Sequence, residues 1–179
     1  MAQTGRSITE SDLHFFGEGT HSKLADVLGA HHFADRGGTQ LGVWAPNAKT
    51  VSVIGDFNNW QAKQHYLEPA GGGLWQGFIS NLYPGSRYKY HIESATSDYV
   101  ADKADPMAFL NETPPQNASV VWDLDYQWGD DAWMASRRAV NSLDAPISIY
   151  EVHLGSWRRG PNNRFLSYRE LADQLIPYV

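Results

Sequence analysis

The stretch of sequence that decides the fold is QLGVWAPNAKTVSVIGDFNN, residues 40–59. It contains two short runs rich in apolar residues, Leu41 to Trp44 and Val51 to Ile54. The turn sequence Pro46-Asn47-Ala48 separates these runs, and Gly55-Asp56-Phe57-Asn58-Asn59 follows the second. Proline, glycine and asparagine are typical of turns, whereas valine, isoleucine and tryptophan are favoured in strands. The stretch therefore predicts two short strands with a turn after each.

Short apolar runs and turn residues continue to alternate along the chain. Three further strands are predicted at Leu74 to Ile79, Arg87 to Glu93 and Ser119 to Trp122. Glycine and proline precede the first two of these strands, as Gly71 to Gly73 and as Pro84-Gly85. Five or more short strands at this spacing are typical of an antiparallel sandwich of about 100 residues. We therefore expect a mainly β fold, an immunoglobulin-like antiparallel β-sandwich over residues 31–125.

The run at Tyr88 to Ile92 also predicts which side chains face the core. Successive side chains of a strand point to opposite faces, so Tyr88 and Tyr90 share one face with Ile92. Lys89 and His91 then lie on the other face, where a ligand could reach them. The aromatic residues that periodicity assigns to the core are Trp44, Trp75, Tyr88 and Tyr90.

The N-terminal flank, residues 1–30, is expected to be a leader followed by a short helix. Met1 to Asp12 is polar and shows no period. Thr20 stands where it could cap an amphipathic turn that contains Leu24 and Leu28, and Gly29 would end that turn. We expect this turn to pack on the sandwich.

The C-terminal flank, residues 126–179, has a different character. Asp130 and Asp131 are placed to cap a helix that runs through Arg138. Ile147 to Leu154 alternates as a strand does, and Ser167 with Glu170 forms the sequence pattern of a capping box. A strand, a loop and a helix are the opening unit of an α/β fold, whose closed barrel form needs about 250 residues. We therefore expect a linker and the truncated start of a (β/α)8 barrel.

Composition excludes several classes of function. The chain has 179 residues, a formal net charge of -6 and no cysteine. It has no basic stretch that could neutralise a nucleic-acid backbone, and no apolar run near the roughly 20 residues that a membrane helix needs. We expect a soluble cytoplasmic protein with neither nucleic acid nor membrane as a partner. Aromatic residues make up 13%, which suits both sandwich cores and sugar-binding surfaces.

No catalytic or metal site is predicted. The neighbouring carboxylates are Asp123 with Asp125 and Asp130 with Asp131, and nothing near either pair would separate their pKa values. Glu151 and His153 share a face near the carboxyl end of the predicted barrel strand, where support of a barrel interior is the favoured role. The seven histidines lack the i, i+4 helical spacing and a third ligand. We expect no metal, no cofactor and no catalytic residue in this chain.

Trp60 is the best candidate for sugar binding. A glucose ring presents an apolar face that an exposed aromatic ring can cover, with polar groups nearby for the hydroxyls. Trp60 follows a predicted strand inside an Asn-rich loop. Two other interpretations stay open: Asn58 and Asn59 form only a turn, or Trp60 is buried as a contact between domains.

A series of motifs resembles one enzyme family. They are FGEGTH (16–21), LGAH (28–31), VWAPNA (43–48), GDFNNW (55–60), YKY (88–90), KADP (103–106), IYEVHLGSW (149–157) and YRELA (168–172). From Asp12 onward the chain is similar to the N-terminal part of bacterial 1,4-α-glucan branching enzymes of glycoside hydrolase family 13. Its middle segment resembles a family 48 carbohydrate-binding module. By motif, the resemblance implies glucan contacts at Trp60 and Lys89, and also at Tyr99 and Asn117, where the match needs gaps.

The resemblance implies a function without catalysis by this chain. Such enzymes cleave an α-1,4-glucan chain and transfer it to a 6-hydroxyl in glycogen biosynthesis, and their catalytic residues have no matching positions here. The first hypothesis is a glucan-positioning segment whose partners are α-glucans (glycogen, amylose, malto-oligosaccharides) and the missing catalytic barrel. The alternative is a self-standing glycogen- or starch-binding adaptor module. A small independent hydrolase would need a local catalytic pair, which the sequence lacks.

Overall fold

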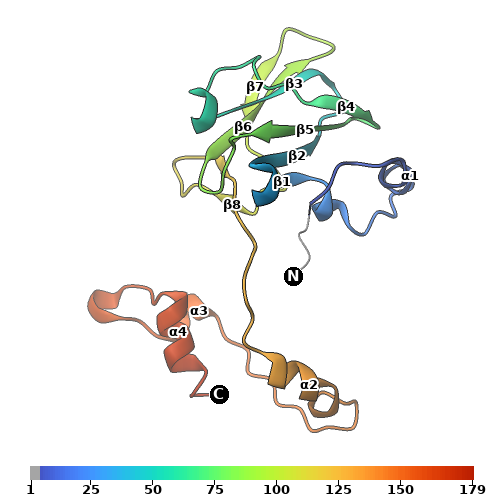
Figure 1. Cartoon of the computed structure of the whole chain (residues 1–179). Coiled ribbons are helices and arrows are strands. Elements are labelled where there is room, and N and C mark those ends of the chain that lie inside the picture. Colours follow the sequence, from blue (N-terminus) through green and yellow to red (C-terminus); the bar gives the residue numbers. More distant parts are fainter. Residues whose placement is uncertain (1–4) are drawn as a thin grey trace. The chain divides into compact units, whose positions relative to one another are not determined.

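The computed structural model describes residues 5–179 and divides the chain into two compact units (Figure 1). The first unit ends at Tyr126, and the second comprises Gln127–Val179. The first contains all the strands, and the second contains helices α2, α3 and α4. Within residues 5–179, no helix combines the length and the apolar character that crossing a membrane requires.

The first unit consists of two antiparallel sheets. One sheet has the order β1-β2-β5-β4, with bounds β1 Gly29–Phe33, β2 Gly38–Trp44, β5 Leu74–Ser80 and β4 Glu68–Gly71. The other has the order β3-β6-β9-β8, and β7 also pairs with β6. Its bounds are β3 Ala48–Gly55, β6 Arg87–Ser94, β9 Ser119–Val120, β8 Leu110–Asn111 and β7 Val100–Lys103. The expectation of antiparallel β-sheets is confirmed, and all five predicted strands are present.

Both sheets contribute to one hydrophobic core. Leu41 from β2 and Trp75 from β5 belong to the same buried cluster as Val53 from β3 and Tyr90 from β6. The predicted alternation in β6 is confirmed, because Tyr88 and Tyr90 are fully buried. Two sheets that share one core form a sandwich.

The phenolic groups of this core meet a buried carboxylate. The hydroxyls of Tyr88 and Tyr90 donate to Oδ2 of Asp105 at 2.6 and 3.0 Å, and the backbone N–H of Met107 donates to Oδ1 at 2.8 Å. Burial raises the pKa of Asp105, while these three hydrogen bonds oppose that shift. The polar atoms of the core therefore have partners, and Asp105 fixes the turn that follows β7.

The core position predicted for Trp44 is wrong. Leu41 and Val43 point into the core, so alternation along β2 directs Trp44 to the opposite face. There its side chain is 54% exposed, and its ring contacts that of Phe16 at 6.1 Å. The prediction for Trp75 is confirmed, because this residue is buried.

The N-terminal flank differs from the prediction within its described part, and residues 1–4 lie outside the described residues. Helix α1, Glu10–Glu18, starts at Thr9, which forms a capping box with Asp12. Thr20 caps no helix, because its backbone N–H bonds the carbonyl of Phe15 at the end of α1. The predicted packing turn is the 3-10 helix Leu24–Asp26. The missed signal was Thr9-Glu10-Ser11-Asp12, an acidic variant of the capping-box pattern.

The second unit contains α2 Asp131–Val140, α3 Leu154–Trp157 and α4 Tyr168–Leu175. The prediction of a strand at Ile147 to Leu154 is wrong. Residues 147–153 take part in no strand pairing, and Leu154 begins α3. A strand needs a partner for its backbone groups, and no described segment pairs with this one. The capping box that starts α4 is confirmed, since Ser167 and Glu170 bond each other's backbone N–H.

Candidate functional site

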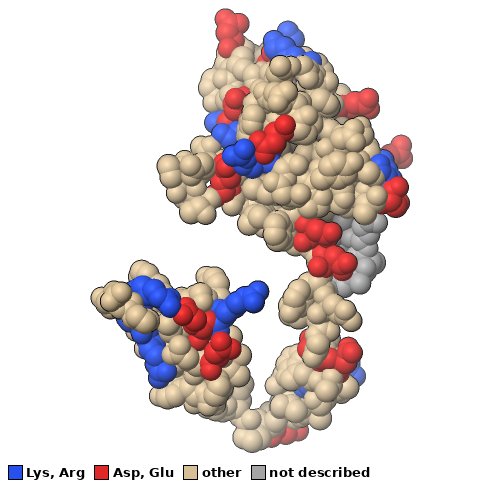
Figure 2. Space-filling model, turned by 60° about the vertical axis from the view of Figure 1, so that its left-hand side comes forward, with Lys and Arg blue, Asp and Glu red and all other residues tan. Residues whose placement is uncertain are grey.

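The outer face of β6 carries a row of paired polar side chains. Because Tyr88 and Tyr90 point into the core, the alternate positions point outward. These positions are Arg87, Lys89, His91 and Glu93. Arg87 binds Asp56 and Glu112, Lys89 binds Asn117, His91 binds Asp102, and Glu93 binds Lys63 and Thr50. Figure 2 shows acidic and basic groups interspersed on the surface of this unit. A face of balanced charges suits an uncharged polar ligand.

Trp60 lies at one end of this face, just after the 3-10 helix Asp56–Asn58. Its backbone N–H donates to the carbonyl of Gly55 at 2.9 Å, and its φ is 60°. Asn58 fixes the loop because its Oδ1 accepts from the N–H of Gly55 at 3.0 Å while its amide donates to the carbonyl of Val53 at 3.0 Å. The Asn-rich segment thus forms a turn, as one interpretation held, and that turn presents Trp60 with 38% of its surface exposed.

Asp56 holds the indole of Trp60 in place. Its Oδ1 accepts from Nε1 of Trp60 at 3.2 Å. Its Oδ2 accepts from Nε of Arg87 at 2.9 Å and from the backbone N–H of Arg87 at 3.0 Å. The bonds from Arg87 lower the pKa of Asp56 in spite of the opposing effect of desolvation. The ring of Trp60 is therefore tied to β6 through an ionised carboxylate.

The structure brings Lys89 and Asn117 together near this end. Nζ of Lys89 donates to Oδ1 of Asn117 at 2.6 Å, although the two residues are 28 positions apart in sequence. Lys89 pairs with Ile54, the neighbour of the Gly55 that holds Trp60. Lys89 and Asn117 are thus in direct contact, and the loop that carries Trp60 begins at Gly55, one residue along β3 from the partner of Lys89.

Tyr99 lies apart from the other three. Its carbonyl accepts from the N–H of Ser94, at the far end of β6 from Tyr88 and Gly55. Tyr88 and Ser94 are six residue steps apart along β6, which corresponds to about 20 Å. Tyr99 is 58% exposed, and Nζ of Lys103 lies 5.9 Å from its ring centroid. A ligand that touches both Trp60 and Tyr99 must span the length of the strand.

Sequence reasoning missed one aromatic residue on this face. Tyr66 forms an isolated antiparallel bridge with Ser52 of β3, and 50% of its surface is exposed. It belongs to no named strand and follows a polar loop, so none of the predicted strands included it. Alternation within His65-Tyr66-Leu67, where Leu67 is buried, could have indicated it.

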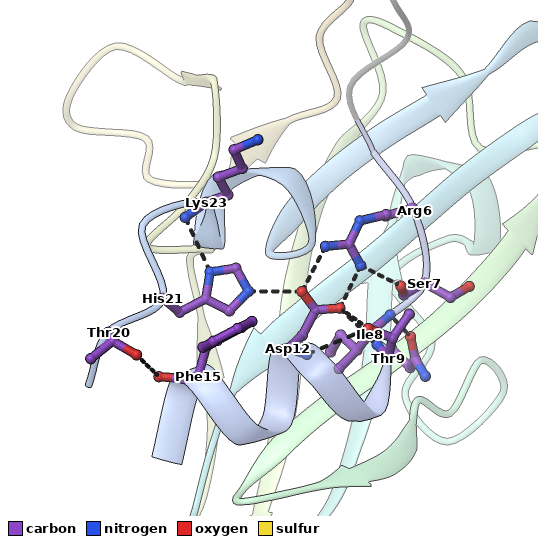
Figure 3. Close-up of polar contacts among 10 residues, drawn as sticks. Arg6, Ser7, Ile8, Thr9, Asp12, Phe15, Thr20, His21 and Lys23 are labelled. Atoms are coloured by element: carbon purple, nitrogen blue, oxygen red, sulfur yellow. Dashed lines mark hydrogen bonds and ion pairs between the residues drawn. The ribbon is translucent and has the colours of Figure 1, made fainter. Parts of the chain in front are cut away.

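A second cluster joins α1 to the segments on either side of it (Figure 3). The carboxylate of Asp12, only 5% exposed, accepts from Nη2 of Arg6 at 2.6 Å and from Nη1 of the same guanidinium. It also accepts from the N–H and hydroxyl of Thr9 at 2.8 and 2.6 Å and contacts Nε2 of His21 at 2.8 Å. The cluster borders an open pocket of about 300 Å³.

The chemistry of this cluster is structural. The guanidinium of Arg6 holds the pKa of Asp12 far below its usual range, against desolvation. A carboxylate with so low a pKa neither accepts nor releases a proton near neutral pH. Since five donors surround its two oxygens, Asp12 serves to join three chain segments.

The remaining predicted candidates do not assemble into a reactive site. Asp123 accepts from the N–H of Asp125 within an irregular segment, which excludes the shared strand face expected for the pair. The common face of Glu151 and His153 is also wrong, since no strand forms there; Nδ1 of His153 instead meets the hydroxyl of Ser156 at 3.1 Å. Over residues 5–179 no group of three or more metal-binding side chains occurs.

Comparisons with known proteins find relatives over nearly the whole chain. Residues 27–108 match the family Carbohydrate-binding module 48 (Isoamylase N-terminal domain). The chain is 51% identical over 173 residues to the 1,4-alpha-glucan branching enzyme GlgB of Albidiferax ferrireducens, with 96% of this chain and 27% of that protein covered. For the Aquifex aeolicus enzyme of the same name, identity is 50% over 178 residues, with 96% and 28% covered. The chain thus spans about a quarter of the length of these relatives.

Among solved structures, a Klebsiella pneumoniae pullulanase complexed with maltotriose shares 20% identity and has a TM-score of 0.48. The match covers 65% of this chain and 11% of that one.

Proposed function

Since this chain corresponds to the N-terminal quarter of bacterial 1,4-alpha-glucan branching enzymes and contains a family 48 carbohydrate-binding module, we propose that its β-sheet unit binds α-glucan. The observation that carries the proposal is the Lys89–Asn117 hydrogen bond on β6, the strand to which Asp56 and Arg87 also tie the exposed ring of Trp60. An aromatic ring and two polar side chains on one face match the apolar and hydroxyl surfaces of glucose.

Each residue of this site has a distinct role. The ring of Trp60 stacks on the apolar face of a glucose unit. Lys89 has three N–H donors and uses one for Asn117, which leaves others for sugar hydroxyls. The Asn117 amide can both donate and accept. Because the ligand is uncharged, affinity comes from stacking and directed hydrogen bonds, so we expect it to change little with salt.

In the first form of this proposal, the chain positions glucan for a branching enzyme. The parent would cleave an α-1,4-glucan chain and transfer it to a 6-hydroxyl in glycogen biosynthesis, in the cytoplasm and without a cofactor. This chain would supply a non-catalytic binding unit at residues 31–125. Residues 126–179 would be a linker and the start of the catalytic barrel, with α4 as its first helix.

The alternative form is a self-standing glycogen- or starch-binding adaptor module. The second unit favours the enzyme form, because Ile147 and Ile149 are each 84% exposed. Tyr168 and Ile176 are also largely exposed. Exposed apolar residues are what a surface that packs against further protein would carry, and an adaptor has no use for them.

Calorimetric titration with maltoheptaose and with glycogen tests glucan binding. We expect saturable binding by the chain and its loss in Trp60→Ala. Trp133→Ala is the matched control, since Trp133 is also an exposed tryptophan but lies on α2 in the second unit. Calorimetry avoids removing the fluorescent reporter together with the contact. A folded Trp60→Ala variant that binds as tightly as the control would refute the site.

A further inference from the structure

We propose that Tyr66, with Lys63 and Glu93 beside it, forms a second glucose-binding subsite on the face that carries Lys89. This inference rests on the proposed function, because it extends the same glucan site. It concerns a residue that the motif-based contacts do not include. The ligand class is a linear α-glucan long enough to continue past Trp60.

The register of the sheet places Tyr66 on the outward face. Tyr66 is paired with Ser52, Ser52 with His91, and His91 with Asp102. Residues directly opposite each other in antiparallel strands project to the same face. The four side chains therefore form a row across the sheet, in which Tyr66 is half exposed while Ser52 is buried beneath the segment that contains Lys63. The parallel row of Ile54 and Lys89 lies two residues further along, at a distance of about 7 Å.

The backbone holds Tyr66 on both sides. The N–H of Val53 donates to the carbonyl of His65 at 2.8 Å, and the N–H of Leu67 donates to the carbonyl of Val51 at 2.9 Å. Leu67 is buried, and the ring of His65 contacts that of Phe57 at 4.9 Å. An aromatic side chain on so constrained a backbone loses little conformational freedom when a ligand binds, which favours affinity.

Polar groups for sugar hydroxyls lie on the same face of the sheet as this ring. Nζ of Lys63 lies 2.6 Å from Oε1 of Glu93, and Oγ1 of Thr50 donates to Oε2 of Glu93 at 2.9 Å. The backbone N–H of Lys63 donates to Oγ of Ser52, the bridge partner of Tyr66, at 3.3 Å. A paired ammonium and carboxylate offer both donors and acceptors without a net charge. This is the chemistry that a neutral polyhydroxylated ligand needs.

Tyr66 also fills the interval between the two aromatic residues predicted from motifs. Along β6, the Trp60 loop lies at the level of Tyr88, the Tyr66 row at His91 and Tyr99 at Ser94. Val100 pairs with the outward-facing Glu93, so its neighbour Tyr99 projects to the opposite face of the sheet, and Tyr66 rather than Tyr99 lies on the face that carries Lys89. The inferred order of contacts is Trp60, Lys89 with Asn117, and then Tyr66.

Ligand length makes the inference testable. We would compare the wild-type chain with Tyr66→Ala by calorimetry, using maltotriose and maltoheptaose. We expect Tyr66→Ala to weaken maltoheptaose binding about tenfold, the size typical of an interface aromatic, and to change maltotriose binding less. Tyr66→Phe keeps the flat ring and should retain most of the affinity. If Tyr66→Ala does not fold, Tyr66→Leu keeps apolar bulk while removing the ring.

Tyr83→Ala is the matched control. Tyr83 is similarly exposed, but its ring contacts His32 of the other sheet, so its loss should leave both affinities unchanged. Undiminished maltoheptaose binding by a folded Tyr66→Ala or Tyr66→Leu variant, with binding lost in Trp60→Ala, would overturn this inference alone. Absence of binding by the wild-type chain would overturn the proposed function and this inference with it.

Discussion

The indole Nε1 of Trp60 donates to Oδ1 of Asp56 at 3.2 Å, which ties the exposed ring to a carboxylate held by Arg87. We predict that Asp56→Ala weakens maltoheptaose binding by about threefold to tenfold, because the ring loses its orientation while its area remains. Asp56→Asn keeps an oxygen that can accept from the indole N–H of Trp60, so it should lose less affinity than Asp56→Ala. Calorimetric titration of both variants measures the effect. Equal affinities for Asp56→Ala and wild type would show that glucan binding by the Trp60 ring does not depend on the hydrogen bond to Asp56.

The hydrogen bond between Lys89 and Asn117 predicts coupling between the two residues. Each of Lys89→Ala and Asn117→Ala should weaken glucan binding, and the double variant should lose less than the sum of the two changes, because the residues act as a pair. A double-mutant cycle measured by titration with maltoheptaose gives the coupling free energy. Losses that add within error would mean that the two side chains contact the ligand independently.

The Asp12 cluster predicts a loss of stability. Asp12→Ala removes the shared acceptor of Arg6, Thr9 and His21, and should reduce the free energy of unfolding by roughly 2–4 kcal/mol. Urea unfolding at pH 7 measures this change. Glu10→Ala is the control, since Glu10 lies in the same helical turn and is exposed. If Asp12→Ala is as stable as Glu10→Ala, the proposed role of Asp12 in joining the three chain segments is contradicted.

The same cluster predicts a pH dependence. The pKa of Asp12 is lowered in the folded chain, so its contribution to stability is present above the pKa of the unfolded carboxyl group, about 4. The contribution decreases as pH falls below that value, because the carboxyl group of the unfolded chain then binds a proton that the folded chain, with Asp12 kept ionised by Arg6, does not bind. The difference in the free energy of unfolding between wild type and Asp12→Asn should become smaller as the pH is lowered from 5 to 2. A constant difference would argue against an ionised Asp12.

Because the chain spans only about a quarter of the branching enzymes that it is similar to, we predict that it does not process glucan by itself. Prolonged incubation with amylose should leave the iodine-stained chain length and the reducing-end count unchanged. A full-length branching enzyme is the positive control for the assay. Turnover that copurifies with the chain would reinstate the independent hydrolase.

Local sequence patterns were sufficient to predict the central strands of the β-sheet unit. The alternation of Tyr88 and Tyr90, and the turn residues that flank Val51 to Ile54, predicted the central strands because strand periodicity and turn chemistry act over a few residues. Short edge strands such as Leu110–Asn111 carry too few residues to show a period. Helix α1 was missed although Thr9 and Asp12 carried the signal of its capping box.

What the sequence by itself determined is the set of central strands, the core residues Trp75, Tyr88 and Tyr90, and the resemblance that selected Trp60 and Lys89. Only the tertiary structure decided that Lys89 meets Asn117, that Tyr99 lies at the far end of β6, and that Tyr66 shares the outer face. It also decided that residues 147–153 form no strand, since strand formation depends on a partner elsewhere in space. Periodicity is local, whereas pairing and the choice of neighbours depend on contacts between residues far apart in the chain.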